Sequence, residues 1–380
     1  MPKIYLDYAA TTPVDPEVIA AMIPYFQGYF GNASSPHAYG RDAHKALEEA
    51  RECLADFIGA DSGEIVFTSG ATEANNHAVI GTARARREKG KHIIVSAIEH
   101  HSVLEPVEYL REREGFDVTY LKVDHDGLVD PLAIQKAIRS DTILAAVMCA
   151  SNEIGTVQPI TEIGAITQKN NVLFLVDAVQ AVGHIPINVN ELKADLLSLS
   201  AHKFYGPKGV GALYIRKGVD IAPFLLGGDQ ERGRRASTQN VCGAVGLAKA
   251  VELCAQRMKY EAVNQTNLRN RLLAQVPKLI PGVRINGHRT KRLPNNAHFS
   301  FEGVQGESLV MGLDQADIAV SMGSACTSGA MKSSHVLRAI GLSDELAHGA
   351  LRITLGRWTT AEQIDYLLDQ LPGLVKSLRT

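Results

Sequence analysis

A lysine at the end of an apolar run is the residue of this chain best placed for covalent chemistry. Residues 196–199 are mostly apolar and lead into Ser200-Ala201-His202-Lys203, after which a turn rich in glycine and proline follows. Buried strands of α/β proteins have this pattern, and ligands bind at their carboxyl ends. Desolvation there lowers the pKa of a lysine, whose neutral amine forms a Schiff base with a carbonyl cofactor, usually pyridoxal phosphate. The alternative is a lysine whose ammonium group reaches solvent from the strand end.

Four polar residues follow other apolar runs and suit a flat heteroaromatic cofactor. Asp177 ends the run 172–177, and a carboxylate there would keep a pyridinium nitrogen protonated. Gln180 and Asn152 would donate hydrogen bonds to a ring oxygen without adding charge. His100 would stack on the ring. Each residue also has a purely structural alternative. Asp177 could cap the next turn, Gln180 and Asn152 could be ordinary loop residues, and His100 could be a hydrogen-bonded residue at a strand end.

Residues 69–76 join a short apolar run, 65–68, to a helical pattern, and the joint contains Gly70, Ala71 and Thr72. A glycine turn that leads into a helix N-terminus presents unpaired N–H groups to a phosphate. Local evidence alone favours an ordinary helix N-cap, at Thr72 or Ser69. The phosphate site gains weight because a phosphate-bearing cofactor is already indicated by Lys203.

Cys326 differs from the other cysteines in its setting. It lies in residues 321–329, where small residues stand on both sides, whereas Cys53, Cys149 and Cys254 have apolar neighbours. Small residues of this kind are typical of an exposed loop, and an exposed cysteine is a candidate thiolate nucleophile. We therefore expect the segment 321–333 to be a mobile loop that presents a reactive thiol.

Two arginine-containing segments need anionic partners. Arg352 lies in a strand-like segment, where a substrate carboxylate or an internal salt bridge would satisfy it. The segment 227–238 is rich in glycine and arginine, and we expect it not to pack as a core element. Its arginines have no interleaved aromatic residues, so the segment favours a phosphate contact or a subunit interface over nucleic acid.

The elements that position these residues alternate along the chain. We expect strands at 92–96, 117–121, 142–148, 172–177 and 196–200, with helices at 104–114, 132–138 and 160–170 between them. This alternation predicts an α/β fold with a mainly parallel sheet, whose strand ends bring the polar groups to one edge. A long helical pattern from 241 towards 279 leads to a smaller α+β part, with strands at 296–301 and 318–320 and a closing helix at 362–378. We expect a large cofactor-binding domain at 15–258 and a small domain at 1–14 and 259–380.

Composition excludes several classes of protein. The 380 residues are 45% hydrophobic and 21% charged, with a formal net charge of −2, as in a globular enzyme that binds neither nucleic acid nor membrane. No apolar run approaches the roughly 20 residues of a membrane span, and the N-terminus lacks the apolar core of a signal peptide. Five cysteines without a CxxC pair fit neither a disulfide framework nor a metal site. A reducing, cytoplasmic location is expected.

Six motifs in order resemble those of the NifS/IscS-type cysteine desulfurases, pyridoxal phosphate enzymes of the class V aminotransferase group. The resemblance runs nearly end to end and implies fold type I, with a seven-stranded, mainly parallel sheet in the large domain. The motifs are Thr68-Ser69-Gly70-Ala71-Thr72-Glu73, Glu99-His100, Asn152-Glu153-Ile154-Gly155, Asp177-Ala178-Val179-Gln180, Ser200-Ala201-His202-Lys203 and Gly323-Ser324-Ala325-Cys326-Thr327-Ser328.

The resemblance also implies a role for each residue. Lys203 would carry the cofactor and move a proton at the substrate α-carbon, and Cys326 would accept sulfur from L-cysteine as a persulfide. Asn32, Asn152 and Arg352 would bind the substrate. A homodimer and a sulfur-acceptor protein, such as an iron–sulfur scaffold, would be the partners; a lyase or transaminase acting on another amino acid is the alternative. The implied cofactor-binding residues are Ala71, Thr72, His100, Asn152, Asp177, Gln180, Ser200, His202, Lys203 and, from the neighbouring subunit, Thr238.

Overall fold

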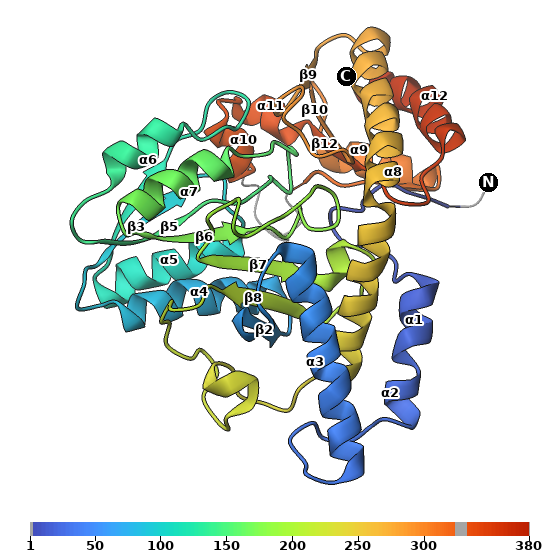
Figure 1. The fold of residues 1–380 in the computed structure, drawn as a ribbon. Coiled ribbons are helices and arrows are strands. Elements are labelled where there is room, and N and C mark those ends of the chain that lie inside the picture. The colour runs from blue at the N-terminus through green and yellow to red at the C-terminus, as the bar shows by residue number, and fades with distance from the viewer. Residues whose placement is uncertain (1–2, 324–332, 380) are drawn as a thin grey trace.

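Seven strands form the central sheet of the molecule (Figure 1), in a computed structural model that describes residues 3–323 and 333–379. β8 runs antiparallel to both of its neighbours, and the other adjacent pairs are parallel. The predicted α/β fold with a mainly parallel seven-stranded sheet is confirmed. In spatial order the strands are β2 (Ile65–Thr68), β8 (Gly211–Ile215), β7 (Leu196–Ser200), β6 (Leu173–Asp177), β5 (Thr142–Ala146), β3 (His92–Ser96) and β4 (Asp117–Leu121).

Helices cover both faces of this sheet because its strands are apolar on both sides. Leu173 and Leu175 of β6 pack with α4 and α5, whereas Phe174 and Val176 pack with α3, α7 and α8 on the opposite face. Figure 1 shows α4 and α5 below the sheet and α6 and α7 above it. The helices are α3 (Ala38–Ile58), α4 (Ala71–Ala85), α5 (His101–Glu114), α6 (Pro131–Ala137), α7 (Ile160–Lys169) and α8 (Val241–Leu279).

A second apolar core lies at the far end of α8. It contains Leu272 and Val276 of that helix together with Phe299, Leu351 and Ile364 of the C-terminal segments. β9, β10 and β12 form an antiparallel sheet there, and α8 continues unbroken through the predicted domain boundary at 258/259, which stays a prediction. The C-terminal elements are β9 (Val283–Ile285), β10 (Asn296–Phe301), α9 (Gly306–Gln315), β11 (Ile318–Ala319), α10 (His335–Ala339), α11 (Asp344–His348), β12 (Ala350–Thr354) and α12 (Ala361–Leu378).

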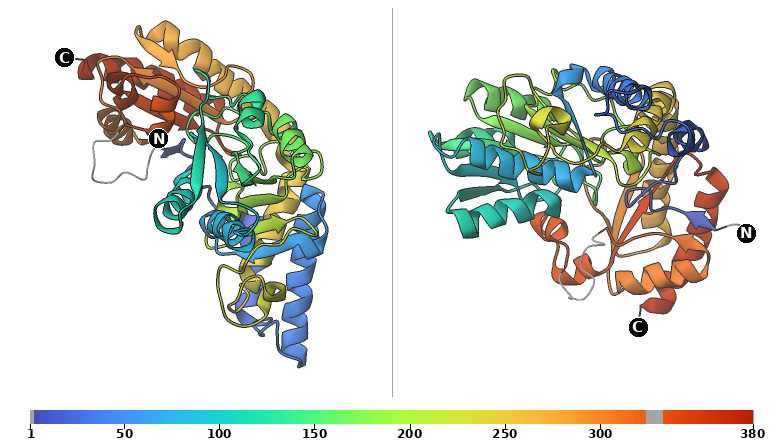
Figure 2. Two further views of the ribbon diagram at one scale, coloured as in Figure 1. Left: turned by 90° about the vertical axis from the view of Figure 1, so that its left-hand side faces the viewer. Right: turned by 90° about the horizontal axis from the view of Figure 1, so that it is seen from below.

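The N-terminal arm returns to this C-terminal layer. β1 (Ile4–Tyr5) pairs in parallel with β11, and Asp7 forms a bridge to Thr354. Figure 2 shows the orange and red C-terminal segments gathered beside the N-terminus at one end of the molecule. Residues 8–12 then cross towards the large sheet, and α1 (Pro16–Met22) and α2 (Pro24–Gln27) follow. None of the helices in the described ranges combines the length and the apolar character that a bilayer crossing requires.

The central sheet contains a strand that was not predicted, and the expectation for the segment 227–238 is wrong. The strand β8 does not appear among the predicted strands, although it is buried between β2 and β7. The segment 227–238 does contribute a core contact, because Glu231 is buried and pairs with the Arg51 guanidinium at 2.6 and 2.9 Å. The backbone N–H of Phe67 also donates to Glu231 at 2.9 Å. Charge neutralisation by Arg51 explains how a polar, glycine-rich segment packs against β2.

Candidate active site

A cavity of about 570 Å³ opens at the carboxyl ends of β5, β6 and β7 and the segment after β3. The cavity therefore lies at the edge of the sheet where the polar side chains were predicted to converge. The N-terminal arm closes one side of the cavity with Ala9, Ala10 and Thr11. The predicted site residues that line it are Ala71, Thr72, His100, Asn152, Asp177, Gln180, Ser200, His202, Lys203 and Arg352.

Lys203 lies in a short 3-10 turn, Ala201–Lys203, that directly follows β7. Its Nζ donates hydrogen bonds to the carbonyl oxygens of Ala9 at 2.7 Å and Ala10 at 2.9 Å. Gln180 Nε2 donates to the same Ala9 oxygen at 3.0 Å. Two residues after Lys203 the backbone has a positive φ of 68° at Tyr205, whose N–H donates to the Thr12 hydroxyl. The arm thus fixes both the amine and the turn that carries it.

A buried hydrogen-bond chain links Asp177 to His100. Asn75 Nδ2 donates to Asp177 Oδ2 and to Ser102 Oγ, each at 2.9 Å, and Ser102 Oγ lies 2.8 Å from His100 Nδ1. The Ser102 backbone N–H also donates to His100 Nδ1, so this nitrogen is the acceptor and His100 caps α5. Burial lowers the pKa of His100, partly offset by Asp177. The site therefore presents a neutral imidazole and an oriented carboxylate.

The turn before α4 is an open helix N-terminus. Gly70 is the N-cap, with a φ of 155° and no side-chain cap, so an N-cap at Ser69 or Thr72 is wrong. Gly70 adopts a conformation that side-chain-bearing residues rarely take, which explains why the capping preference of serine and threonine does not apply. A Cβ built at Gly70 would lie 3.7 Å from Ser200 Oγ, which brings this hydroxyl to the same turn. Unpaired N–H groups at a helix N-terminus, together with a hydroxyl, are donors of the kind that bind anions.

His202 stands at the edge of the cavity beside the arm. Its Nδ1 lies 3.0 Å from Thr11 Oγ1. Burial, and then the charges of Lys203 and Lys208, lower the pKa of His202 to about 4. The imidazole is therefore neutral near pH 7 and acts as a hydrogen-bonding group rather than as a charge.

Arg352 forms the internal salt bridge, and its binding of a substrate carboxylate stays a prediction. It pairs with Asp7 at 2.7 Å, so an internal salt bridge exists, and it also lines the cavity. Its Nη1 donates to the carbonyl oxygens of Asn152 at 2.8 Å and Gly323 at 3.4 Å. Among the described residues, the buried Nε has no hydrogen-bond partner. The guanidinium is thus oriented from several sides at the cavity wall.

Three predicted site residues are not brought into this cavity by the described part of the chain. Asn32 lies in the turn before α3, where its side-chain oxygen accepts from the Ser34 N–H at 2.9 Å. Thr238 is exposed on the loop before α8 and does not line the cavity of its own chain. Cys326 lies outside the described residues, as does most of the segment 321–333.

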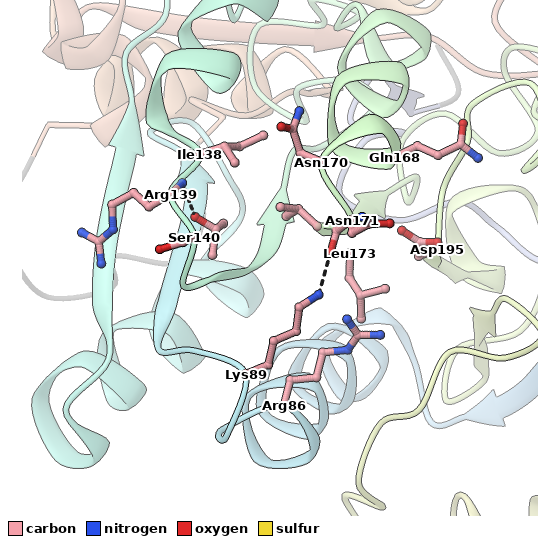
Figure 3. Close-up of a pocket in the computed structure, with 12 residues that line it drawn as sticks. Arg86, Lys89, Ile138, Arg139, Ser140, Gln168, Asn170, Asn171, Leu173 and Asp195 are labelled. Atoms are coloured by element: carbon pink, nitrogen blue, oxygen red, sulfur yellow. Dashed lines mark hydrogen bonds between the residues drawn. The ribbon is translucent and has the colours of Figure 1, made fainter.

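A second hollow of about 900 Å³ lies at the amino ends of β5 and β6 (Figure 3). Figure 3 shows Lys89 reaching the Asn171 carbonyl oxygen, at 2.9 Å. Arg139 pairs with Asp141 at 2.8 Å. None of the described residues that line it is a cysteine or a histidine, and Lys89 and Arg139 are held in structural contacts. The cavity around Lys203 is therefore the candidate active site.

Sequence reasoning missed the residues that orient the site. Asn75 follows Ala71 by four residues on α4, so helical periodicity places both on one face, and this signal was available. The contacts of Ala9 and Ala10 with Lys203 could not be recognised in the sequence. Every residue has a backbone carbonyl oxygen, and about 190 positions separate the two alanines from the lysine.

Comparison with known proteins agrees with this architecture. The family model described as Aminotransferase class-V matches residues 4–367. A cysteine desulfurase IscS of Dictyoglomus turgidum is 54% identical over 378 residues, which cover 100% of this chain and 96% of the relative. A solved structure described as a NifS-like protein is 39% identical, with a TM-score of 0.93 over 99% of this chain and 100% of that one. A structure described as SspA in complex with cysteine is 36% identical, with a TM-score of 0.83 over 94% and 100% of the two chains. The chain belongs to the aminotransferase class-V family.

Proposed function

We propose that this chain is a pyridoxal phosphate-dependent cysteine desulfurase that converts L-cysteine to L-alanine and transfers the sulfur to Cys326. The carbon–sulfur bond of the substrate breaks, a sulfur–sulfur bond forms at Cys326, and the thiol proton displaced from Cys326 balances the hydrogen gained by alanine. The observation that carries the proposal is the joint presence of Lys203 and Asp177 in one cavity. Relatives named cysteine desulfurase, at about half identity over the whole chain, support the substrate.

The donor set of the cavity fits pyridoxal phosphate. The uncapped start of α4, with Ala71 and Thr72, would hold a phosphate together with Ser200 and His202. The neutral His100 imidazole would lie on the ring, and the Asp177 carboxylate would pair with the ring nitrogen. When bound, this cofactor supplies an electron sink for the carbanion formed at the substrate α-carbon.

Residues of the chain would transfer the proton and bind the substrate. Lys203 takes and returns the proton at the substrate α-carbon, because its amine lies in the cavity and is held within reach by two arm carbonyls. Arg352 would bind the substrate carboxylate as an oriented cation, and Asn152 stands beside it. Preorganisation by Asp7 keeps this guanidinium in place before the substrate arrives.

Incubation of the purified protein with L-cysteine and a reductant is expected to yield alanine and sulfide in equal amounts. The visible absorbance of the bound cofactor should change when L-cysteine is added. L-Serine, which lacks the sulfur, serves as the control and should release no alanine. A protein that forms pyruvate, or that turns over only with a keto-acid acceptor, would instead be a lyase or a transaminase.

We also propose that the enzyme works as a homodimer. The exposed apolar residues Ile19, Ile23, Phe26 and Phe30 recur at helical spacing over α1, α2 and the residues that follow. An exposed apolar face of this kind is typical of an interface with another protein surface. Thr238 lies outside the cavity of its own chain, which is compatible with a contribution to the partner's phosphate site.

Replacing both Phe26 and Phe30 by glutamate is expected to convert the dimer into monomers, because each subunit would bury two charges in an apolar contact. Light scattering after size-exclusion chromatography measures the mass. Tyr260→Glu on α8, which changes an aromatic that is 79% exposed on another helix, is the control and should remain dimeric. A doubly substituted protein with the mass of the wild type would contradict an interface at this face.

The persulfide would pass to a sulfur-acceptor protein, for which an iron–sulfur scaffold is our proposal. A reactive thiol of this kind requires a reducing compartment, and we therefore propose a cytoplasmic location.

A further inference from the structure

Glu153 is a buried carboxyl residue that the proposed chemistry does not use. It lies in the turn after β5, next to Asn152, and is 3% exposed. Its backbone is fixed: the N–H donates to Ser151 Oγ at 3.3 Å, and the carbonyl oxygen accepts from Asn296 Nδ2 at 3.0 Å. Burial raises the pKa of Glu153, while Ser334 and Arg352 act in the opposite direction. A carboxyl group held this rigidly is suited to anchoring its neighbours.

One neighbour is Ser334, which follows the segment that contains Cys326. Ser334 Oγ donates to Glu153 Oε2 at 2.6 Å, and both side chains are buried. The same hydroxyl accepts from the Leu337 N–H at 3.2 Å and so caps α10. The chain is therefore fixed at Ser334, eight positions after Cys326.

The other neighbour is Gly323, three positions before Cys326. A Cβ built at Gly323 would lie 3.6 Å from both Cβ and Cγ of Glu153 and 3.3 Å from Nε2 of the buried His298. Gly323 has a φ of +101°, which side-chain-bearing residues rarely adopt. Its carbonyl oxygen accepts from Arg352 at 3.4 Å. Glu153 is thus bonded to the chain after the Cys326 segment, through Ser334, and lies beside the chain before it, at Gly323.

The turn that carries Glu153 also belongs to the cavity wall. Asn152 lines the cavity, and its carbonyl oxygen accepts from Arg352 at 2.8 Å. The residue proposed to bind the substrate carboxylate and the two flanks of the Cys326 segment therefore share one rigid support.

We propose that Glu153 is a positioning residue for sulfur transfer, because it binds Ser334 and lies beside Gly323, in a turn that also holds Arg352, and so helps to set where the Cys326 segment starts and ends. This inference rests on the proposed function, in which Cys326 accepts the sulfur. A displacement of about 1 Å between reacting groups can lower a rate by about 100-fold, so the loss of such an anchor would slow sulfur transfer without weakening cofactor binding.

Four variants of the cofactor-loaded enzyme test this role. Glu153→Ala and Ser334→Ala remove the hydrogen bond from either side, whereas Glu153→Gln keeps an oxygen that accepts from Ser334. Ser343→Ala is the matched control for the lost cap, because Ser343 caps α11 through the Leu346 N–H at 3.4 Å. Two rates are measured after L-cysteine is mixed with each protein: the absorbance change on substrate binding, and the formation of persulfide on Cys326, trapped by alkylation.

Persulfide formation is expected to fall about 10- to 100-fold in Glu153→Ala and Ser334→Ala. The absorbance change should stay within about twofold of wild type in every variant, because the cofactor contacts are intact, and Glu153→Gln and Ser343→Ala should stay near wild type in both rates. Wild-type persulfide formation in Glu153→Ala overturns the proposal. So does an equal loss in both rates, or a loss in Ser343→Ala as large as in Ser334→Ala, since each indicates a general structural role. Alanine release at the wild-type rate in Cys326→Ala would overturn the proposed role of Cys326 as the sulfur acceptor, whereas wild-type persulfide formation in Glu153→Ala would overturn only the positioning role of Glu153.

Discussion

Replacing Lys203 by arginine is expected to lower alanine production by about 10²- to 10⁴-fold, the range associated with the loss of a positioned proton-transfer group. Arginine keeps a cation that can reach the carbonyl oxygens of Ala9 and Ala10, which accept from Lys203 at 2.7 and 2.9 Å. Its guanidinium, however, stays protonated at any working pH and neither attacks a carbonyl nor accepts a proton. The substitution therefore separates the chemistry of the amine from its charge.

Reduction with borohydride followed by mass spectrometry measures the covalent attachment of the cofactor. Wild type should carry it on Lys203, and the Lys203→Arg variant should carry none. Lys208→Arg is the matched control, since Lys208 also lines the cavity, and it should keep the label on Lys203. A labelled Lys208 in wild type, or full activity in Lys203→Arg, would contradict the assignment.

Much of this fold was predictable because its signal is local. The strands β3, β4 and β7 coincide with their predicted ranges, since short apolar runs bounded by polar turns fit buried parallel strands well. Polar residues at the ends of β6 and β7 were expected to converge, and Asp177 and Ser200 do line one cavity. The rule that ligands bind at the carboxyl ends of parallel strands carried this prediction.

The contacts that orient the site were not predictable, because their partners are distant in sequence. Asp7 pairs with Arg352 across 345 positions, and neither residue's neighbours indicate the other. Glu231 is similar: its glycine- and arginine-rich surroundings suggest an exposed loop, yet Arg51, 180 positions earlier, makes its burial possible. Local composition gives the preference of a segment, whereas ion pairs between distant elements decide where that segment packs.

Replacing Cys326 by alanine is expected to lower alanine production by at least about 10²-fold while cofactor binding and the absorbance change with L-cysteine persist. Sulfur transfer needs a thiolate, and the other cysteines are poorly suited to supply one. Burial raises the pKa of Cys149 and Cys254 to about 12, and it also raises the pKa values of Cys53 and Cys242. Burial thus disfavours a thiolate at each of the four described cysteines, which supports the proposal that Cys326 accepts the sulfur.

Cys242→Ala provides the matched control for loss of a thiol, because Cys242 is half-buried on α8 and does not line the cavity. It should retain wild-type rates of alanine and sulfide formation. Alkylation and mass spectrometry after a single turnover should place the extra sulfur on residue 326 in wild type and in Cys242→Ala. Extra sulfur on Cys149 or Cys254 would mean that a buried thiol becomes reactive during turnover. An undiminished rate in Cys326→Ala would move the sulfur acceptor away from residue 326, although the amine and carboxylate of the cavity would still account for cleavage of the carbon–sulfur bond.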